Sequence, residues 1–126
     1  MNFKTDTKEK FTVLSVECNQ LTANLSAPLF HRVRELAETP PHNVILKLDG
    51  VGQMDREVAD GLALLRQEMY ELQHSFVVCS LQDAVYANVA GWEMEEALNL
   101  TPTESEAWDI VQMDEIEREF LSGEDT

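Results

Sequence analysis

The stretch Val44-Ile-Leu-Lys-Leu-Asp-Gly-Val-Gly-Gln-Met-Asp55 carries the clearest structural signal in this chain of 126 residues. Its first half is nearly continuously apolar, which is typical of a strand buried in the middle of a sheet. Two glycines follow, and then an aspartate of the kind that favours the start of a helix. We therefore expect a buried strand over Asn43–Asp49, a loop over Gly50–Met54 and a helix from Asp55.

A long helical pattern follows this stretch. Apolar residues recur at spacings of three and four from Val58 to Leu72, which predicts an amphipathic helix over Asp55–Leu72. Ser75–Ser80 is again apolar and predicts a second buried strand. A strand, a helix and a strand of these lengths form a right-handed parallel crossover, so the fold class is α/β.

The flanking sequence continues the alternation of strands and helices. β-Branched and apolar residues predict a strand over Phe11–Glu17, with residues 3–8 beside it as an edge strand. Start and stop signals predict a helix between Ser26 and Pro40, a short helix over Gln82–Ala90, a brief strand around Ala97–Leu100 and a last helix capped by Thr101 or Thr103.

The length and composition fit one globular domain. Hydrophobic residues make up 44% and charged residues 26% of the chain, which is enough apolar surface for a core without a metal or a disulfide. We expect a single domain over residues 1–121 and a short acidic tail over residues 122–126.

The net charge of −15 is unevenly distributed along the chain. Residues 1–66 hold nine acids and eight bases, whereas residues 67–126 hold fifteen acids and the single base Arg118. Such a field repels nucleic acids and anionic membranes, which bind through lysine and arginine. The acids either keep the protein soluble or steer a basic partner onto its surface. Charge thus excludes classes of ligand without identifying one.

The sequence favours a reduced, cytoplasmic setting. No apolar run approaches the ~18 residues of a membrane span, so we expect no membrane insertion. The N-terminus lacks the basic start and apolar stretch of a signal peptide. Cys18 and Cys79 lie in or beside apolar strand-like runs, and their spacing is not that of metal ligands.

The segment Gly50–Glu57 is the strongest candidate for a site. Gly50 and Gly52 stand where a dinucleotide fingerprint would lie, but Asp55 occupies the place of its third glycine. Asp55 and Glu57 would also repel a phosphate from the helix start. Asp55 has a plain structural explanation as a helix cap. Because further oxygen ligands are not evident, we expect no metal site and no cofactor.

Other chemistry-bearing residues form no catalytic pattern. Histidines 31, 42 and 74 are scattered, and no serine, threonine or cysteine has an identifiable base. Both tryptophans fit core or half-buried packing. Trp92 lies with Glu93 in an acidic predicted loop, so these two residues are the candidates for a second interface.

The order of the elements and several local strings resemble the STAS domain, the fold of bacterial anti-sigma factor antagonists, which is found also in the tails of sulphate transporters. Val44–Asp55 is similar to the family's apolar strand, short loop and hydrophobe–aspartate pair. Leu98-Asn-Leu-Thr-Pro-Thr-Glu-Ser-Glu-Ala-Trp108 is similar to its last strand and the start of its last helix. The resemblance covers nearly the whole chain. It implies a mixed β-sheet of about five strands with about four helices packed mainly on one face.

The chain departs from the family at the switch motif. There the aspartate is followed by two hydroxyl residues, glycine and leucine, and a partner kinase phosphorylates one hydroxyl. Here Arg56-Glu-Val-Ala59 follows, so Glu57 matches the phosphorylated position. A rival register aligns Ala59-Asp-Gly-Leu62 and puts Asp60 there instead. Neither register restores a hydroxyl, because no serine or threonine occurs between Gly50 and His74.

A second departure lies in the first half of the chain. The family often has a Gly-x-Leu-Asp turn after its second main strand, and Asn19-Gln-Leu-Thr22 stands there instead.

The resemblance implies a protein-interaction module in a regulatory partner-switching system, not an enzyme. The expected contact surface is Met54, Asp55, Arg56, Glu57 and Val58, and the expected partner is an anti-sigma factor or kinase or a related STAS-system protein. Glu57 would imitate phosphoserine only partly, because it carries less charge. The alternative is an accessory or docking subunit of a transporter or of a larger signalling assembly. A homodimer is left open, and nucleotide binding ranks last.

Overall fold

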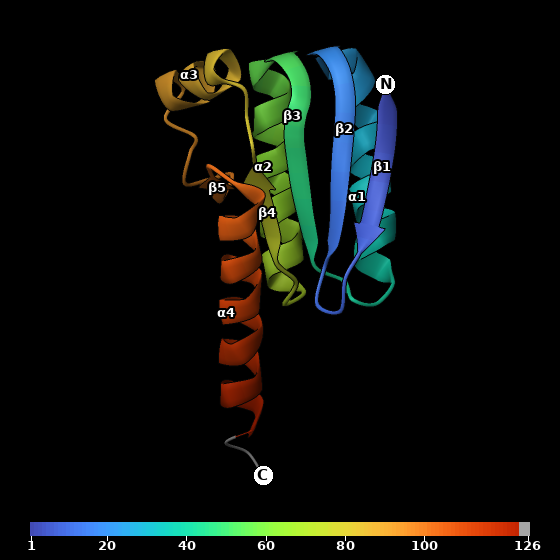
Figure 1. The fold of residues 1–126 in the computed structure, drawn as a ribbon, viewed down its shortest axis with the longest axis vertical. Coiled ribbons are helices and arrows are strands. Elements are labelled where there is room, and N and C mark those ends of the chain that lie inside the picture. Colours follow the sequence, from blue (N-terminus) through green and yellow to red (C-terminus); the bar gives the residue numbers. More distant parts are fainter. Residues whose placement is uncertain (124–126) are drawn as a thin grey trace.

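The computed structural model describes residues 1–123, which form a five-stranded sheet with four α-helices and one 3-10 turn (Figure 1). The expected α/β class is confirmed. In chain order the elements are β1 (Asn2–Thr7), β2 (Thr12–Leu21), η1 (Ala23–Leu25), α1 (Ser26–Glu38), β3 (Val44–Met54), α2 (Arg56–Glu71), β4 (Phe76–Cys79), α3 (Asp83–Gly91), β5 (Leu100–Thr101) and α4 (Glu104–Gly123).

The strands lie in the order β1-β2-β3-β4-β5. β1 pairs antiparallel with β2 along one edge, and every other neighbouring pair is parallel. The predicted edge hairpin and the predicted parallel crossover through α2 are therefore both present. The sheet is mixed because only the hairpin reverses the direction of the chain.

The expected loop over Gly50–Met54 is wrong, because β3 continues to Met54. β2 runs beside it to Leu21, which pairs with Met54, and the ladder between the two strands satisfies the backbone of this segment. The glycines permit a close approach of β2: a Cβ on Gly50 would lie 2.7 Å from the carbonyl oxygen of Val16. They therefore serve strand packing and do not form a loop.

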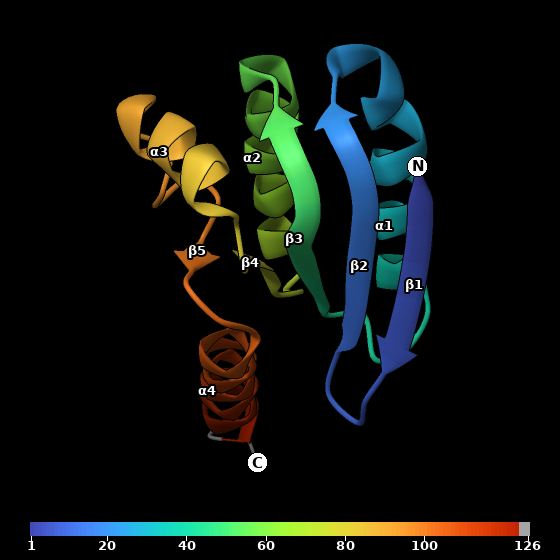
Figure 2. The same ribbon diagram turned by 45° about the horizontal axis from the view of Figure 1, so that its top comes forward.

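The helices cover the two faces of the sheet unequally. Buried residues of α1, α2 and α3 share the larger core cluster with the strand residues Leu46 and Val78. The neighbouring strand residues Ile45 and Val77 face the opposite side, where they pack with Ala107 of α4. Figure 2 shows α1 and α2 behind the sheet and α4 apart from them. This agrees with helices packed mainly on one face.

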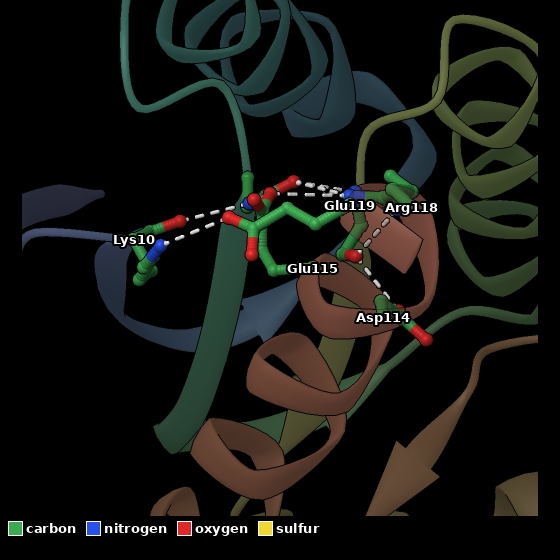
Figure 3. Close-up of polar contacts among 7 residues, drawn as sticks. Lys10, Asp114, Glu115, Arg118 and Glu119 are labelled. Carbon is green, nitrogen blue, oxygen red and sulfur yellow. Dashed lines mark hydrogen bonds and ion pairs between the residues drawn. The ribbon is translucent and has the colours of Figure 1, made fainter. Parts of the chain in front are cut away.

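A polar network holds α4 against the ends of the strands (Figure 3). The buried side chain of Asn43 donates to the Lys10 carbonyl oxygen (2.8 Å) and to Glu115 Oε1 (2.7 Å), and accepts from the Ser75 backbone N–H (2.8 Å). Arg118 donates to Ser75 Oγ (2.8 Å) and to Glu115 Oε1 (3.3 Å). One face of α4 is thus fixed by hydrogen bonds as well as by apolar packing.

The C-terminal third differs from the prediction in its boundaries. The brief strand is Leu100–Thr101, not Ala97–Leu100, because Leu98 N–H bonds within a turn to the carbonyl oxygen of Met94 (3.1 Å). Thr103 is the cap of α4: its hydroxyl accepts from the backbone N–H of Glu106 (3.2 Å). α4 includes the first two residues of the expected tail, and residues 124–126 lie outside the described residues.

Candidate protein-binding site at the start of α2

The candidate site lies at the edge of the sheet where β2 and β3 both end. Because the two strands are parallel, their carboxyl ends lie side by side, and the chain leaves them into η1–α1 and into α2. Leu21 and Met54 are the last paired residues of this ladder, and both are buried. A surface that follows two paired strands is held rigidly, which suits the binding of a ligand or a partner.

Asp55 joins these two chain segments. It accepts a backbone N–H as expected, but the donor is Ala23 of η1, at 3.2 Å from Oδ2, and not a residue of α2. The expected side-chain cap of α2 is therefore wrong. The backbone N–H of Asp55 donates to the carbonyl oxygen of Leu21 at 3.0 Å. Asp55 thus fixes the start of α2 to the turn that follows β2.

The structure divides the expected contact residues into exposed and buried ones. Asp55, Arg56 and Glu57 are exposed, whereas Met54 and Val58 are buried in the larger core cluster. Within residues 1–123, the side chains of Arg56 and Glu57 have no ion-pair partner within 4.0 Å. Their charges are therefore available to another molecule, and the two buried side chains hold the turn in place.

Both registers of the resemblance place an acid on the surface. Glu57 lies in the first turn of α2, and Asp60 lies three residues further along the helix; both are exposed. A negative charge in the first turn interacts favourably with the positive end of the helix dipole. Glu57 is better placed than Asp60 for this interaction because the effect fades beyond the first turn.

The same edge carries residues that the sequence analysis did not assign. Gln20 Nε2 donates to Gln53 Oε1 at 2.6 Å across the ends of β2 and β3, and both side chains are exposed. Asn24 and Leu25 of η1, which follow Gln20 by four and five residues, are also exposed. The position of Asn19–Thr22 directly after a predicted strand was a usable signal, because parallel strands end at the same edge.

The remaining candidates are placed as follows. Trp92 is half-buried and packs against the larger core cluster, while Glu93 beside it is exposed with φ of 58°. His31 lies on α1, but His42 and His74 come together with stacked rings, 4.8 Å between centroids and 5° between planes. The sequence separation of these two histidines gave no sign of the pairing.

In the part of the chain that the structure describes, no helix is both long and apolar enough to cross a membrane. Over residues 1–123, histidine, cysteine, aspartate and glutamate form no group of three or more placed to hold a metal ion.

Similar proteins were found only among solved structures. No protein-family model matches the sequence, and no curated protein matches it either. A STAS domain protein from Planctomyces limnophilus superposes with a TM-score of 0.73 and 17% identity over 87% of this chain and 97% of that one. A putative anti-sigma factor antagonist from Thermotoga maritima superposes with a TM-score of 0.72 and 15% identity, over 87% of this chain and 94% of that one.

The fold also matches part of a larger protein. Murine Slc26a9, an anion transporter, matches with a TM-score of 0.67 and 18% identity over 86% of this chain, which spans only 18% of the transporter's length. Identities this low concern the fold alone. They confirm the expected resemblance at that level: the chain has the fold of the STAS domain.

Proposed function

We propose that the protein is a non-catalytic interaction module that binds a regulatory protein through Asp55, Arg56 and Glu57. The observation that carries the proposal is the exposed, oppositely charged pair Arg56 and Glu57, which has no ion-pair partner within the described residues and follows a rigid junction of two strands. Charged side chains on such an edge favour specific recognition of a complementary surface. The similarity to solved anti-sigma factor antagonists supports a partner of that regulatory class.

Regulation of this surface does not come from phosphorylation of a serine or threonine in the segment Gly50–His74, because none occurs between its ends. Glu57 carries one negative charge, whereas phosphoserine carries about −1.5 to −2 at neutral pH. We propose that Glu57 gives the surface a permanent, weaker version of the modified charge. A partner that distinguishes phosphorylated from unphosphorylated surfaces of this kind would then always meet the same charge on this protein.

The experiment is a titration of the purified protein with the anti-sigma factors and kinases of its source cell. Arg56→Glu and Glu57→Lys each reverse one exposed charge, and Glu38→Lys does the same at the exposed opposite end of α1. We expect the first two variants to raise the dissociation constant about tenfold or more, and the third to leave it unchanged. Retention of every partner by both site variants would place the contact surface elsewhere.

A second candidate function is a static docking subunit of a transporter or a larger assembly. The fold similarity to a part of Slc26a9 favours it. A pull-down distinguishes the two: recovery of a permease or an ATPase in place of an anti-sigma factor would favour docking. Size-exclusion chromatography with light scattering on the same sample tests the open alternative of a homodimer.

The non-catalytic part of the proposal has its own test. Gly50 and Gly52 lie inside β3 and leave no glycine loop at the start of α2 for a phosphate. Calorimetric titration with ATP, GTP and Mg²⁺ should therefore show no saturable binding. Saturable binding would overturn this part of the proposal.

A further inference from the structure

α4 has two apolar sides, and only one of them is covered. Ala107 and Val111 are buried against the sheet. Met113, Ile116 and Phe120 are 62%, 64% and 67% exposed. Their spacings of three and four residues place these three side chains on one line along the helix, on the side away from Val111. We call Met113, Ile116 and Phe120 the α4 stripe.

A stripe of this kind does not follow from the packing of α4 within the chain. A surface helix needs one apolar side to bind its own domain, and Ala107 and Val111 already supply it. Figure 1 shows α4 extending past the ends of the strands, so its last turns project from the body of the domain. Exposed apolar side chains gathered in a line mark a surface for a partner more often than single ones do.

A cleft adjoins the stripe. It has a volume of about 690 Å³ and lies between α4 and the end of α2. Ile110, Glu117 and Leu121 line it from α4, and Tyr70 lines it from α2. Arg66 and Arg118 also line it, and their guanidinium groups donate to the Glu96 carbonyl oxygen (2.9 Å) and to Ser75 Oγ (2.8 Å). Ile110 and Glu117 are three and four residues from Met113, so the cleft continues directly from the stripe. Tyr70 and Leu121 are 70% and 66% exposed and extend the apolar area.

The charges around the stripe are negative. Glu106, Asp109 and Glu117 are exposed on the same side of α4, and among residues 1–123 no cationic side chain lies within 4.0 Å of them. Arg118, the one base of α4, is turned toward the sheet, where it donates to Ser75 and Glu115 (Figure 3). An apolar line flanked only by acids is complementary to an apolar line flanked by bases.

We propose that the α4 stripe, together with the side of the cleft that Ile110, Glu117 and Leu121 form, binds a basic amphipathic helix of a partner protein. The stripe covers eight residues, from Met113 to Phe120, a rise of roughly 10 Å along the helix, which matches the i, i+3 or i+4, i+7 anchors of a bound helix. Lysine and arginine beside those anchors meet Glu106, Asp109 and Glu117. A second copy of this chain is disfavoured, because two such helices would bring acids against acids, and an anionic membrane is repelled in the same way.

The α4 stripe is separate from the surface formed by Asp55–Glu57, and the proposal for the stripe does not depend on the function proposed for that surface. The two lie at opposite ends of the molecule, since β2 and β3 end at one edge and the exposed turns of α4 project beyond the other (Figure 1). The protein therefore offers two contact surfaces, one at each end of the sheet. An Arg56→Glu/Glu57→Lys variant should keep its affinity for a helix on α4.

The test uses a synthetic helical peptide of about 18 residues, long enough to hold a helix, with leucine at the anchor spacing and lysine and alanine elsewhere. A peptide of the same composition in scrambled order is the control. We expect saturable binding of the ordered peptide, measured by fluorescence anisotropy with the full chain, and weakening as salt rises. Equal binding of the scrambled peptide would overturn the proposal, because charge alone would then explain it.

Matched variants locate the binding. Ile116→Ser/Phe120→Ser removes two exposed apolar side chains from the stripe. The control Leu64→Ser/Leu72→Ser removes two apolar side chains that are 68% and 64% exposed, one on α2 and one at its C-terminal end. The first pair should weaken the peptide about tenfold or more, and the second should leave the affinity unchanged. Unchanged affinity in the first pair would overturn the proposal. A dimer of the wild-type protein in sedimentation equilibrium that the Ile116→Ser/Phe120→Ser variant no longer forms would also overturn the proposal. Binding of the protein to lipid vesicles would do the same.

Discussion

The carboxylate of Asp55 accepts a hydrogen bond from the backbone N–H of Ala23 at 3.2 Å, so the residue that begins α2 also holds the turn that begins η1. The backbone N–H of Asp55 returns a bond to the carbonyl oxygen of Leu21 at 3.0 Å. The first bond joins residues 32 apart in the sequence and the second joins residues 34 apart. Arg56 and Glu57 follow directly, so the position of the proposed contact surface depends on this link.

Asp55→Ala should lower the free energy of unfolding by about 1 kcal/mol, because it removes a charge-assisted hydrogen bond and a favourable charge at a helix start. Asp55→Asn keeps an acceptor and should lose about half as much. Urea unfolding measures both values, and amide exchange should be faster at Ala23. Asp60→Ala, which changes an exposed carboxylate on the same helix, should stay within about 0.5 kcal/mol. Unchanged exchange at Ala23 in Asp55→Ala would show that the bond is not made in solution.

Gly50→Ala should destabilise the protein by about 1–3 kcal/mol through overpacking. The added Cβ would lie 2.7 Å from the Val16 carbonyl oxygen. This backbone atom belongs to β2, which is paired on both sides and cannot move aside easily. Gly91→Ala adds the same group at the end of α3, where no atom lies within 4 Å, and should be neutral or gain up to about 1 kcal/mol. Thermal and urea unfolding compare the two. Equal effects would contradict the close approach of β2 to β3.

Stability should fall as the pH is lowered through the range in which histidine titrates. Burial lowers the pKa of His74 from its usual 6.5, and the positive charges of His42 and Arg118 lower it further, while Glu115 opposes the shift. The unfolded chain therefore binds a proton at His74 more readily than the folded protein does. The stability is fully present above about pH 6.5 and is lost as the pH falls from there toward the lowered pKa.

The measurement is urea unfolding at about pH 7.5 and pH 5.5. His74→Gln should reduce the loss of stability between the two values, because the group that takes up the proton is absent. His31→Gln, which changes an exposed histidine on α1, should keep the wild-type loss. An identical loss in wild type and His74→Gln would assign the pH dependence to other groups.

Arg118→Met should lower the free energy of unfolding by about 1–3 kcal/mol, since Glu115 loses its cation and Ser75 Oγ loses a donor at 2.8 Å. Arg118→Lys should recover less than half, because lysine cannot reproduce the planar fork of donors. Amide exchange should rise in the second half of α4. Lys10→Met breaks an exposed ion pair of 3.6 Å with Glu119 and should cost under about 0.5 kcal/mol. Equal costs for Lys10 and Arg118 would contradict the network.

Several local features were predictable because their physical causes lie close together in the chain. The helix of α2 follows from apolar spacing between Val58 and Met69, and the cap of α4 follows from Thr103 and the backbone N–H of Glu106. The error over Gly50–Met54 has an equally definite cause. Glycine favours a loop locally, but the ladder with β2 converts this segment into strand.

The sequence by itself determined the order of elements, the α/β class, the uneven charge and the lack of a hydroxyl between Gly50 and His74. These properties depend on composition or on periodicity within one element. The tertiary structure alone decided that Asp55 bonds to Ala23, that His42 stacks on His74 and that α4 keeps the stripe of Met113, Ile116 and Phe120 exposed. Each of these depends on which distant segments meet in space, and local spacing carries no information about that.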